Sequence, residues 1–410
     1  MSFSGTTTGV LATVALTTAA LAILKHTLWP RHPQIIPSPL HTVLPSLSEA
    51  SLSALDYRPD AFPGARDVST PYGSIRVYEW GPETGPKVLF IHGISTTCMT
   101  LGKLAHALVN EKGCRVMLFD LFGRGFSDGV GDLPHDARLY TTQCLLALSS
   151  SPLPWTGTSA LRVIGYSLGG GIAVHLAATI PQTISSLVLL APSGLIEPHS
   201  FGALSNFLFR TGIVPERLLA FLTKRRLQRP IAASSTARRH RTTTTTTTTT
   251  TQPSSPSPSS SSPNNPIDAS LAEIPNPNPT TTTTSSPDKP PQDQDPDPDL
   301  SKKVYAQVRW SLQNNAAFIP TFMSTIRHGP LVNQHSAFSK LAARPPKSTV
   351  VLLAEDDEII DPVHYAAAAL PLLGGAGHVV WSIVPGAGHD FPMSCPGEVL
   401  GVVYGAWGWD

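Results

Sequence analysis

Short apolar runs rich in β-branched residues alternate with helix-length segments through much of this 410-residue chain, and this alternation constrains the fold most strongly. Runs of this length and composition are typical of strands that are buried on both faces of a sheet. The runs are 87–91, 114–119, 161–164, 186–190, 348–353 and 378–384, and helix-length segments between them include 101–110, 139–148 and 168–180. The pattern predicts an α/β fold, with a mostly parallel sheet flanked by helices and an antiparallel strand over 75–80 at its front.

A long interval without strands interrupts this alternation after Leu190. Two helical patches, 201–227 and 301–327, lie on either side of residues 242–300, which hold thirteen prolines and two threonine runs. Few apolar residues occur there, so the tract cannot bury enough surface to offset its chain entropy. We therefore expect a helical cap interrupted by a disordered insert. The predicted domains are a core in two parts, 46–195 and 341–410, and the cap over 196–340 with the insert at 242–300.

The overall charge and the cysteines exclude some classes of protein. Lys and Arg number 29 against 28 Asp and Glu, so no net field favours a nucleic acid as the partner. The four cysteines are too few for a disulfide scaffold and lack the spacing of metal ligands. We therefore expect neither a nucleic acid as a partner of the chain nor a metal ion bound by its cysteines.

The N-terminal segment is apolar and uncharged from Gly9 to Leu24 and is followed by Lys25, His26 and Arg31. A cleaved secretory signal carries positive charge before its apolar run, and residues 1–24 contain no Lys or Arg. The segment therefore predicts an uncleaved single-pass membrane anchor, with residues 1–45 forming the anchor and a proline-rich stalk. Because the basic residues follow the span, the remainder of the chain is expected on the cytosolic side.

The sequence Gly165-Tyr-Ser167-Leu-Gly169 stands between a predicted strand and a predicted helix. A serine in a tight strand-to-helix turn has a strained backbone, and the residues two positions before and after it must be small. The turn exposes the serine hydroxyl at a helix N-terminus, where free N–H groups stabilise negative charge. The pattern therefore predicts that Ser167 is a nucleophile.

A second loop, His92-Gly93-Ile94, follows the predicted strand 87–91. In a serine hydrolase built this way, the backbone N–H groups of Ile94 and Leu168 would form the oxyanion hole, which binds the charge that develops in the transition state. His92 precedes the nucleophile in the chain and is expected to hold the loop in place rather than to act as the base.

A serine nucleophile needs a base, and the base needs a carboxylate that orients it. After the cap, the strand ending at Leu353 leads into Ala354 and four consecutive carboxylates, and the next strand leads into the loop that contains His389. His389 is the predicted base. Asp357 is the leading candidate for the acid, with Asp356 as the alternative.

These motifs together resemble those of the α/β-hydrolase superfamily. The resemblance covers about residues 70–195 and 345–400 and includes the glycine-rich stretch 119–128, in addition to the motifs already described. In this family that stretch is mainly structural, so Asp120, Arg124 and Ser127 are not offered as catalytic. The chain is most similar to the branch that includes monoacylglycerol lipases and carboxylesterases, which differs from it by a glycine where Ala354 stands and by having no counterpart of the insert.

The residues and the resemblance together predict a serine hydrolase that cleaves a carboxylic ester through an acyl-enzyme and needs no cofactor. The expected partners are a membrane and a small acyl ester, lipid-derived such as a monoacylglycerol, because a tether and a cap rich in Phe and Leu suit apolar substrates. An amidase or peptidase, a carbon–carbon bond hydrolase, and a ligand-binding protein that keeps the fold without catalysis remain as alternatives.

Overall fold

The computed structural model describes residues 4–28, 32–157, 160–196, 209, 214–228, 267, 271, 273–274 and 298–409. At its centre is an eight-stranded sheet with the order β10-β9-β8-β7-β4-β5-β3-β2. The six strands from β10 to β5 are parallel, whereas β3 pairs antiparallel with β5 and β2 pairs antiparallel with β3. The strands are β2 (Arg66–Thr70), β3 (Gly73–Trp80), β4 (Lys87–Ile91), β5 (Arg115–Phe119), β7 (Leu161–Tyr166), β8 (Ile184–Leu190), β9 (Thr349–Ala354) and β10 (Val380–Val384).

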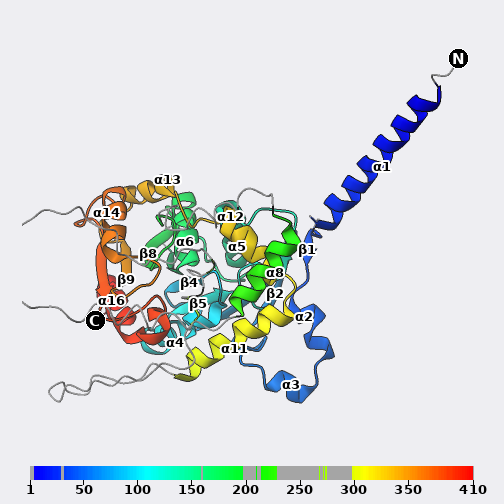
Figure 1. The fold of residues 1–410 in the computed structure, drawn as a ribbon. Coiled ribbons are helices and arrows are strands. Elements are labelled where there is room, and N and C mark those ends of the chain that lie inside the picture. Colours follow the sequence, from blue (N-terminus) through cyan, green and yellow to red (C-terminus); the bar gives the residue numbers. More distant parts are fainter. Residues whose placement is uncertain are drawn as a thin grey trace, which may run out of the picture.

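Helices cover both faces of this sheet (Figure 1), with α5, α6 and α13 on one face and α4 and α16 on the other. Their apolar sides and the strand interiors form one continuous core. The helices of this layer are α4 (Gly102–Lys112), α5 (Ala137–Ser149), α6 (Leu168–Thr179), α13 (His335–Ser339), α14 (Pro362–Leu372), α15 (Phe391–Ser394) and α16 (Pro396–Trp407). Smaller elements are β1 (Ile35–Ile36), β6 (Gly129–Val130), α2 (Pro39–Thr42), α3 (Glu49–Ser53), η1 (Leu44–Ser46), η2 (Cys98–Leu101) and η5 (Lys340–Ala343).

The predicted α/β architecture is confirmed, including the antiparallel strand at the front. Each of the six predicted parallel strands is present, with its start or end moved by at most two residues. Strand β2 was not predicted. Its exposed and half-buried residues alternate, so it lacks the continuous apolar run by which the inner strands are recognised.

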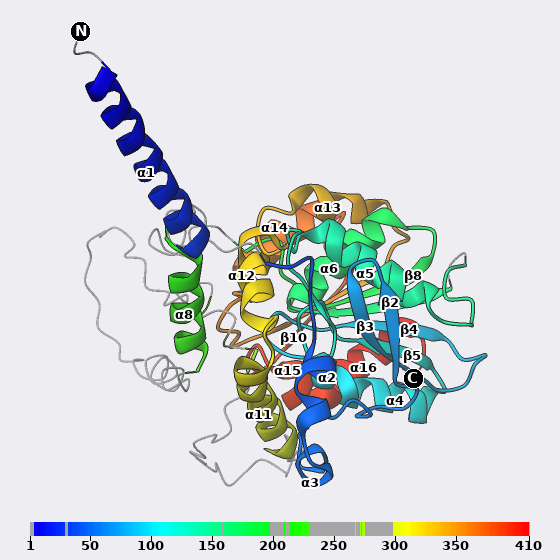
Figure 2. The same ribbon diagram turned by 90° about the vertical axis from the view of Figure 1, so that its right-hand side faces the viewer.

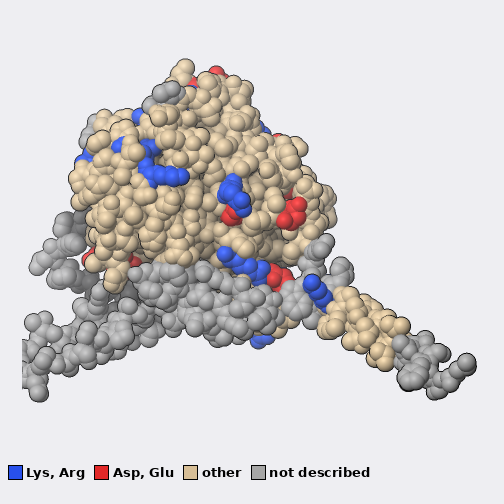
Figure 3. Space-filling view, turned by 90° about the horizontal axis from the view of Figure 1, so that it is seen from above, with Lys and Arg blue, Asp and Glu red and all other residues tan. Residues whose placement is uncertain are grey.

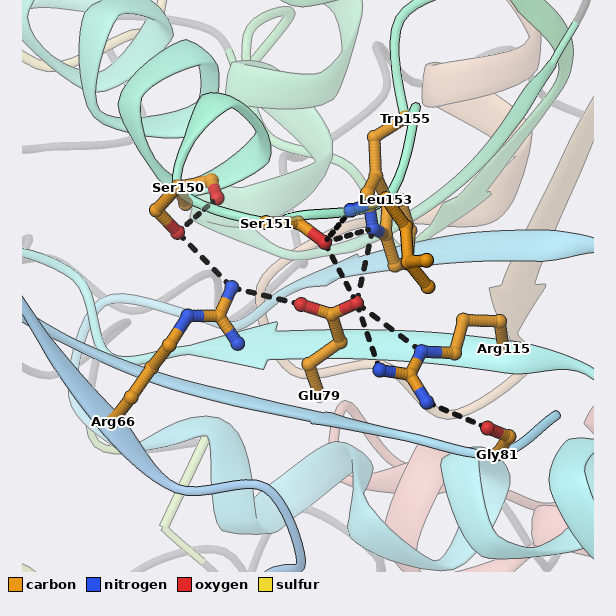
Figure 4. A network of polar contacts seen from close by, with 9 residues as sticks. Arg66, Glu79, Gly81, Arg115, Ser150, Ser151, Leu153 and Trp155 are labelled. Carbon is orange, nitrogen blue, oxygen red and sulfur yellow. Dashed lines mark hydrogen bonds and ion pairs between the residues drawn. The ribbon is translucent and has the colours of Figure 1, made fainter. Parts of the chain in front are cut away.

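A buried carboxylate, that of Glu79, ties the antiparallel edge of the sheet together (Figure 4). Its side chain is 1% exposed and forms ion pairs with Arg66 of β2 at 2.8 Å and Arg115 of β5 at 3.0 Å. Ser151 and Trp155, in the loop after α5, also donate hydrogen bonds to it. Burial alone would raise the pKa of Glu79, but these donors and the nearby cations lower it. The charge is therefore compensated, as a buried charge must be.

The described part of the cap lies beside the sheet and consists of α8 (Glu216–Leu227), α11 (Pro298–Asn314) and α12 (Phe318–His328) (Figure 2). The expected division at 196–340 stays a prediction. Most of the expected disordered insert, 242–300, lies outside the described residues. Of its described residues, Ile267, Leu271, Glu273 and Ile274 are buried. The last three residues, 298–300, are helical and begin α11, so the insert ends earlier than expected.

Helix α1 (Ser4–Leu28) projects from the rest of the protein (Figures 1 and 2). The expectation that residues 1–45 anchor the chain in a membrane, with the remainder of the chain on the cytosolic side, is wrong. Among the described residues, no helix combines the length and the apolar character that crossing a membrane requires. The run is interrupted by threonines, and four of their hydroxyls donate to the carbonyl four residues earlier: Thr13, Thr17, Thr18 and Thr27.

Charged side chains are sparse on the face seen in Figure 3, and both signs occur there. This agrees with the sequence, in which only 14% of residues are charged. The described part of this face therefore has no extended region of one charge that would attract a charged ligand from a distance.

Candidate active site

The candidate site lies where the order of the parallel strands reverses. Strand β4 has β5 on one side and β7 on the other, although β5 and β7 both follow it in the chain. The loops that leave β4 and β7 at their carboxyl ends therefore diverge to opposite sides and leave a crevice, where ligands bind in open α/β sheets. The first loop contains Ile94 and the second contains Ser167.

Ser167 stands at the turn from β7 into α6 and has φ 54° and ψ −117°. Few residues other than glycine adopt such a conformation, and it is held here by hydrogen bonds from Ser167 N–H to the Leu190 carbonyl at 2.9 Å and from Ser193 N–H to the Ser167 carbonyl at 3.0 Å. Glycines are required on both sides because the chain passes itself closely: a Cβ at Gly165 would lie 2.4 Å from the carbonyl oxygen of Gly169.

Gly169→Ala is expected to lower the free energy of unfolding by about 3 kcal/mol or more, since its Cβ would lie 2.0 Å from the carbonyl oxygen of Ile91 in the neighbouring strand. The matched control is Gly401→Ala, in the middle of α16, where a Cβ meets nothing within 4 Å. That change is expected to stabilise the protein by about 0.5–1 kcal/mol. Denaturant unfolding measures both, and equal effects of the two substitutions would contradict the close approach at the turn.

Three of the predicted site residues are in contact. His389 Nε2 lies 3.1 Å from Ser167 Oγ, and His389 Nδ1 lies 2.7 Å from Asp357 Oδ2. Ser167 is 7% exposed and His389 1% exposed, and the Asp357 side chain is fully buried. The carbonyl of His389 also accepts a hydrogen bond from the Tyr166 hydroxyl at 3.0 Å, which fixes the position of its loop.

The second oxygen of Asp357 is held by its own loop, because Oδ1 accepts the N–H groups of Ile359 and Ile360, both at 2.8 Å. Asp356, the alternative acid, is exposed. Burial alone would lower the pKa of His389, but the charge and hydrogen bond of Asp357, followed by the charges of Glu273 and Glu358, raise it above its usual value.

The loop after β4 is rigidly held. Burial lowers the pKa of His92 to about 3, so its ring is neutral. The ring accepts the Leu121 N–H at Nε2 and donates from Nδ1 to the Gly93 carbonyl, both at 2.9 Å. The buried guanidinium of Arg124 donates from Nε to the Ile94 carbonyl at 2.6 Å. The Gly93 carbonyl and the Ile94 N–H belong to one peptide group, so these contacts fix the direction of that N–H. Leu168 begins α6, whose first N–H groups have no partner within the helix.

Glu273 occupies the position in front of the Ile94 N–H. Its Oε1 accepts that group at 3.0 Å and its Oε2 accepts the Ser95 N–H at 2.8 Å, while its side chain is completely buried. Glu273 is not among the predicted site residues, because the tract around it is assigned to the insert on composition. The sequence does contain a sign of local order around Glu273, because Ile267, Leu271 and Ile274 form a short apolar cluster in an otherwise polar tract.

Within the described part of the chain, no group of three or more His, Cys, Asp or Glu side chains could hold a metal ion. The four cysteines are free thiols, of which Cys98, Cys114 and Cys144 are buried. The groups that meet in the crevice are thus a hydroxyl, an imidazole, carboxylates and backbone N–H groups, which suit acid–base and nucleophilic chemistry.

Two curated relatives are similar to part of the chain. Lipase LipV of Mycobacterium tuberculosis is 32% identical over 119 residues, which are 29% of this chain and 42% of that protein. Monoglyceride lipase of Mus musculus is 30% identical over 129 residues, which are 30% of this chain and 41% of that protein. The chain therefore spans less than half the length of either relative.

Solved structures share the fold. A membrane phospholipase A described as a bacterial virulence factor superposes with a TM-score of 0.52 at 17% identity, over 98% of this chain and 99% of that one. The esterase RhEst1 from Rhodococcus superposes with a TM-score of 0.51 at 15% identity, over 83% of this chain and 98% of that one. The sequence model described as the alpha/beta hydrolase fold matches residues 86–393, which is most of the chain, and the protein therefore belongs to the α/β-hydrolase family.

Proposed function

We propose that this protein is a serine hydrolase that cleaves carboxylic esters through an acyl-enzyme on Ser167. The observation that carries the proposal is the continuous line of contacts from Asp357 through His389 to Ser167, with distances of 2.7 and 3.1 Å. Both distances lie within the hydrogen-bond reach that a nucleophile needs to its base and that a base needs to the group that orients it.

In the proposed reaction, His389 Nε2 takes the proton of Ser167 while Oγ forms a bond to the acyl carbon. The carbonyl π electrons move onto oxygen, and the N–H groups of Ile94 and Leu168 stabilise the resulting oxyanion. The tetrahedral intermediate then collapses, and the imidazolium gives its proton to the departing alkoxide. His389 then takes a proton from water as the water oxygen bonds to the acyl carbon. When this second tetrahedral intermediate collapses, the bond to Ser167 Oγ breaks, the acid leaves, and the imidazolium returns the proton to Oγ. Asp357 keeps Nδ1 protonated throughout and stabilises the imidazolium.

An apolar acyl chain, as in a monoacylglycerol, is the proposed substrate group. Two relatives of the chain bear names of lipases. Helix α8 of the cap also leaves Leu218, Phe221 and Leu222 between 44% and 58% exposed, which gives the cap an apolar surface. Apolar surface of this kind favours contact with an acyl chain over contact with a charged substrate.

Two measurements test this proposal. Purified protein is expected to hydrolyse monoacylglycerols and 4-nitrophenyl esters, with kcat/KM rising as the acyl chain lengthens and exceeding that for amides of the same acyl group. Rapid quenching is expected to trap one acyl group on the peptide that contains Ser167, as detected by mass spectrometry. Preferred turnover of the amides would favour an amidase, and acylation of a different residue would contradict the role of Ser167.

A further inference from the structure

A carboxylate of the chain itself occupies the proposed oxyanion hole. Glu273 lies 179 residues from Ile94 in sequence, yet its carboxylate spans two successive N–H groups of the loop after β4, those of Ile94 and Ser95. The contact is close, because a Cβ at Gly93 would lie 2.5 to 2.6 Å from the carboxylate atoms of Glu273. No space remains there for a substrate carbonyl oxygen.

We propose that Glu273 inhibits the hydrolase in cis, by filling the oxyanion hole with its carboxylate. This inference rests on the proposed function, and it adds a regulatory role for a part of the cap. Full activity then requires the Glu273 side chain to leave the N–H groups that it accepts.

The first inhibitory effect is direct competition. An oxyanion hole stabilises negative charge on an oxygen that is neutral in the substrate and charged in the transition state. The carboxylate of Glu273 already accepts from the Ile94 N–H at 3.0 Å, within the normal range for such a bond. The Ile94 donor is thereby taken before any substrate binds.

The second effect acts on the base. The groups that face His389 are Asp357 and Glu358 from the loop after β9, Tyr166 from the end of β7, and Glu273 from the cap. Burial lowers the pKa of His389, and the carboxylates raise it by more, so that the balance is a raised pKa. A protonated imidazole cannot take the proton of Ser167, so the additional negative charge of Glu273 reduces the fraction of His389 that is active at neutral pH.

Apolar neighbours hold Glu273 in the site. Leu271 is 3% exposed and Ile274 is 4% exposed, and the Ile274 N–H donates to the Leu271 carbonyl at 2.9 Å, which closes a turn around Glu273. Ile267 is buried as well. The contact of the carboxylate is therefore part of a packed turn rather than the chance reach of an exposed side chain.

Glu273→Gln in the full chain separates these effects from general packing. Glutamine has the same shape, but it offers one acceptor and one donor where Ile94 and Ser95 present two donors, so one of the two contacts becomes repulsive. We expect this variant to react with a fluorophosphonate and to hydrolyse 4-nitrophenyl acetate faster than the wild type, on the order of 10-fold. The midpoint of its pH–kcat/KM profile is expected at lower pH, because a negative charge near His389 is removed.

Glu273→Ala is expected to increase the rates at least as much, and Glu273→Asp, which keeps the charge on a shorter side chain, to give a smaller increase. Glu83→Gln, at an exposed position between β3 and β4, is the control for the change of one charge and is expected to match the wild type. Thermal unfolding of each variant shows whether it is folded.

The outcomes distinguish this inference from the proposed function. If the wild type and the Glu273 variants are labelled on Ser167 at equal rates with equal pH profiles, the inhibitory role is wrong and the hydrolase proposal stands. Slower reaction of the folded Glu273 variants would assign Glu273 a supporting role in catalysis instead. If folded wild type and variants all fail to react with the probe and the esters, the proposed function fails, and the inhibitory role fails with it.

Discussion

Ser167→Ala is expected to reduce ester turnover by about 10⁴-fold or more and to abolish labelling by a fluorophosphonate. The hydroxyl oxygen that would attack the acyl carbon lies 3.1 Å from His389 Nε2, and the methyl side chain of alanine has no nucleophilic atom to replace it. The fold should be retained, because the backbone of Ser167 makes the hydrogen bonds that hold the turn. His389→Ala is expected to lose a similar factor, since residues that act as a unit lose their effect together.

Ser336→Ala is the matched control, because that serine is exposed on α13 and makes its described hydrogen bond through its backbone carbonyl. It should keep wild-type turnover and labelling. Near wild-type activity in folded Ser167→Ala would refute the assignment of the nucleophile, whereas loss in both serine variants would indicate a fault in the preparation or assay.

Asp357→Asn is expected to reduce kcat by about 10⁴-fold, with little change in stability. Its Oδ1 can still accept the N–H groups of Ile359 and Ile360, so the loop is retained. An amide at the other position no longer holds a proton on His389 Nδ1, and the ring adopts the wrong tautomer for removing the proton of Ser167. The lost negative charge also lowers the pKa of His389.

Asp356→Asn provides the control on the adjacent residue, because the Asp356 side chain is exposed and its backbone N–H alone contacts the His389 loop, through the Ala387 carbonyl at 2.9 Å. Its turnover should stay within about 3-fold of wild type. The reverse order of the two losses would transfer the role of the acid to Asp356, the alternative that the sequence left open.

The inner strands were predictable because each is buried on both faces and is therefore a continuous apolar run, as at Lys87–Ile91. The order in the sheet was only partly predictable. The reversal at β4 depends on which strands pair. Val88 pairs with Val116 of β5 on one side and with Arg162 of β7 on the other, and no local sequence pattern specifies these pairings.

The residues in the candidate site fall into two groups. Ser167 and His389 were predictable because glycines and strand ends mark their loops, and these signals are local. Glu273 was not, since its contacts with Ile94 and Ser95 depend on the path of a distant part of the chain. The tract 242–300 is rich in proline and threonine, and its average composition over 59 residues hides the few apolar side chains that are buried beside Glu273.

The place of the cap between β8 and β9 also bears on the order in which the protein is assembled. Pairing β7 with β8 brings Leu161 next to Ile184 and closes a short loop, whereas pairing β8 with β9 brings Leu190 next to Leu352 and closes a far longer one. The entropic cost of closing the longer loop is greater by about 2 kcal/mol. The segment from β2 to β8 includes the turn with Ser167 and leaves the ribosome before the cap, whereas Asp357 and His389 follow the cap, in the loops after β9 and β10. A growing chain would therefore have its proposed nucleophile long before its proposed base and acid, and would gain the proposed activity only after β10 and the His389 loop are made.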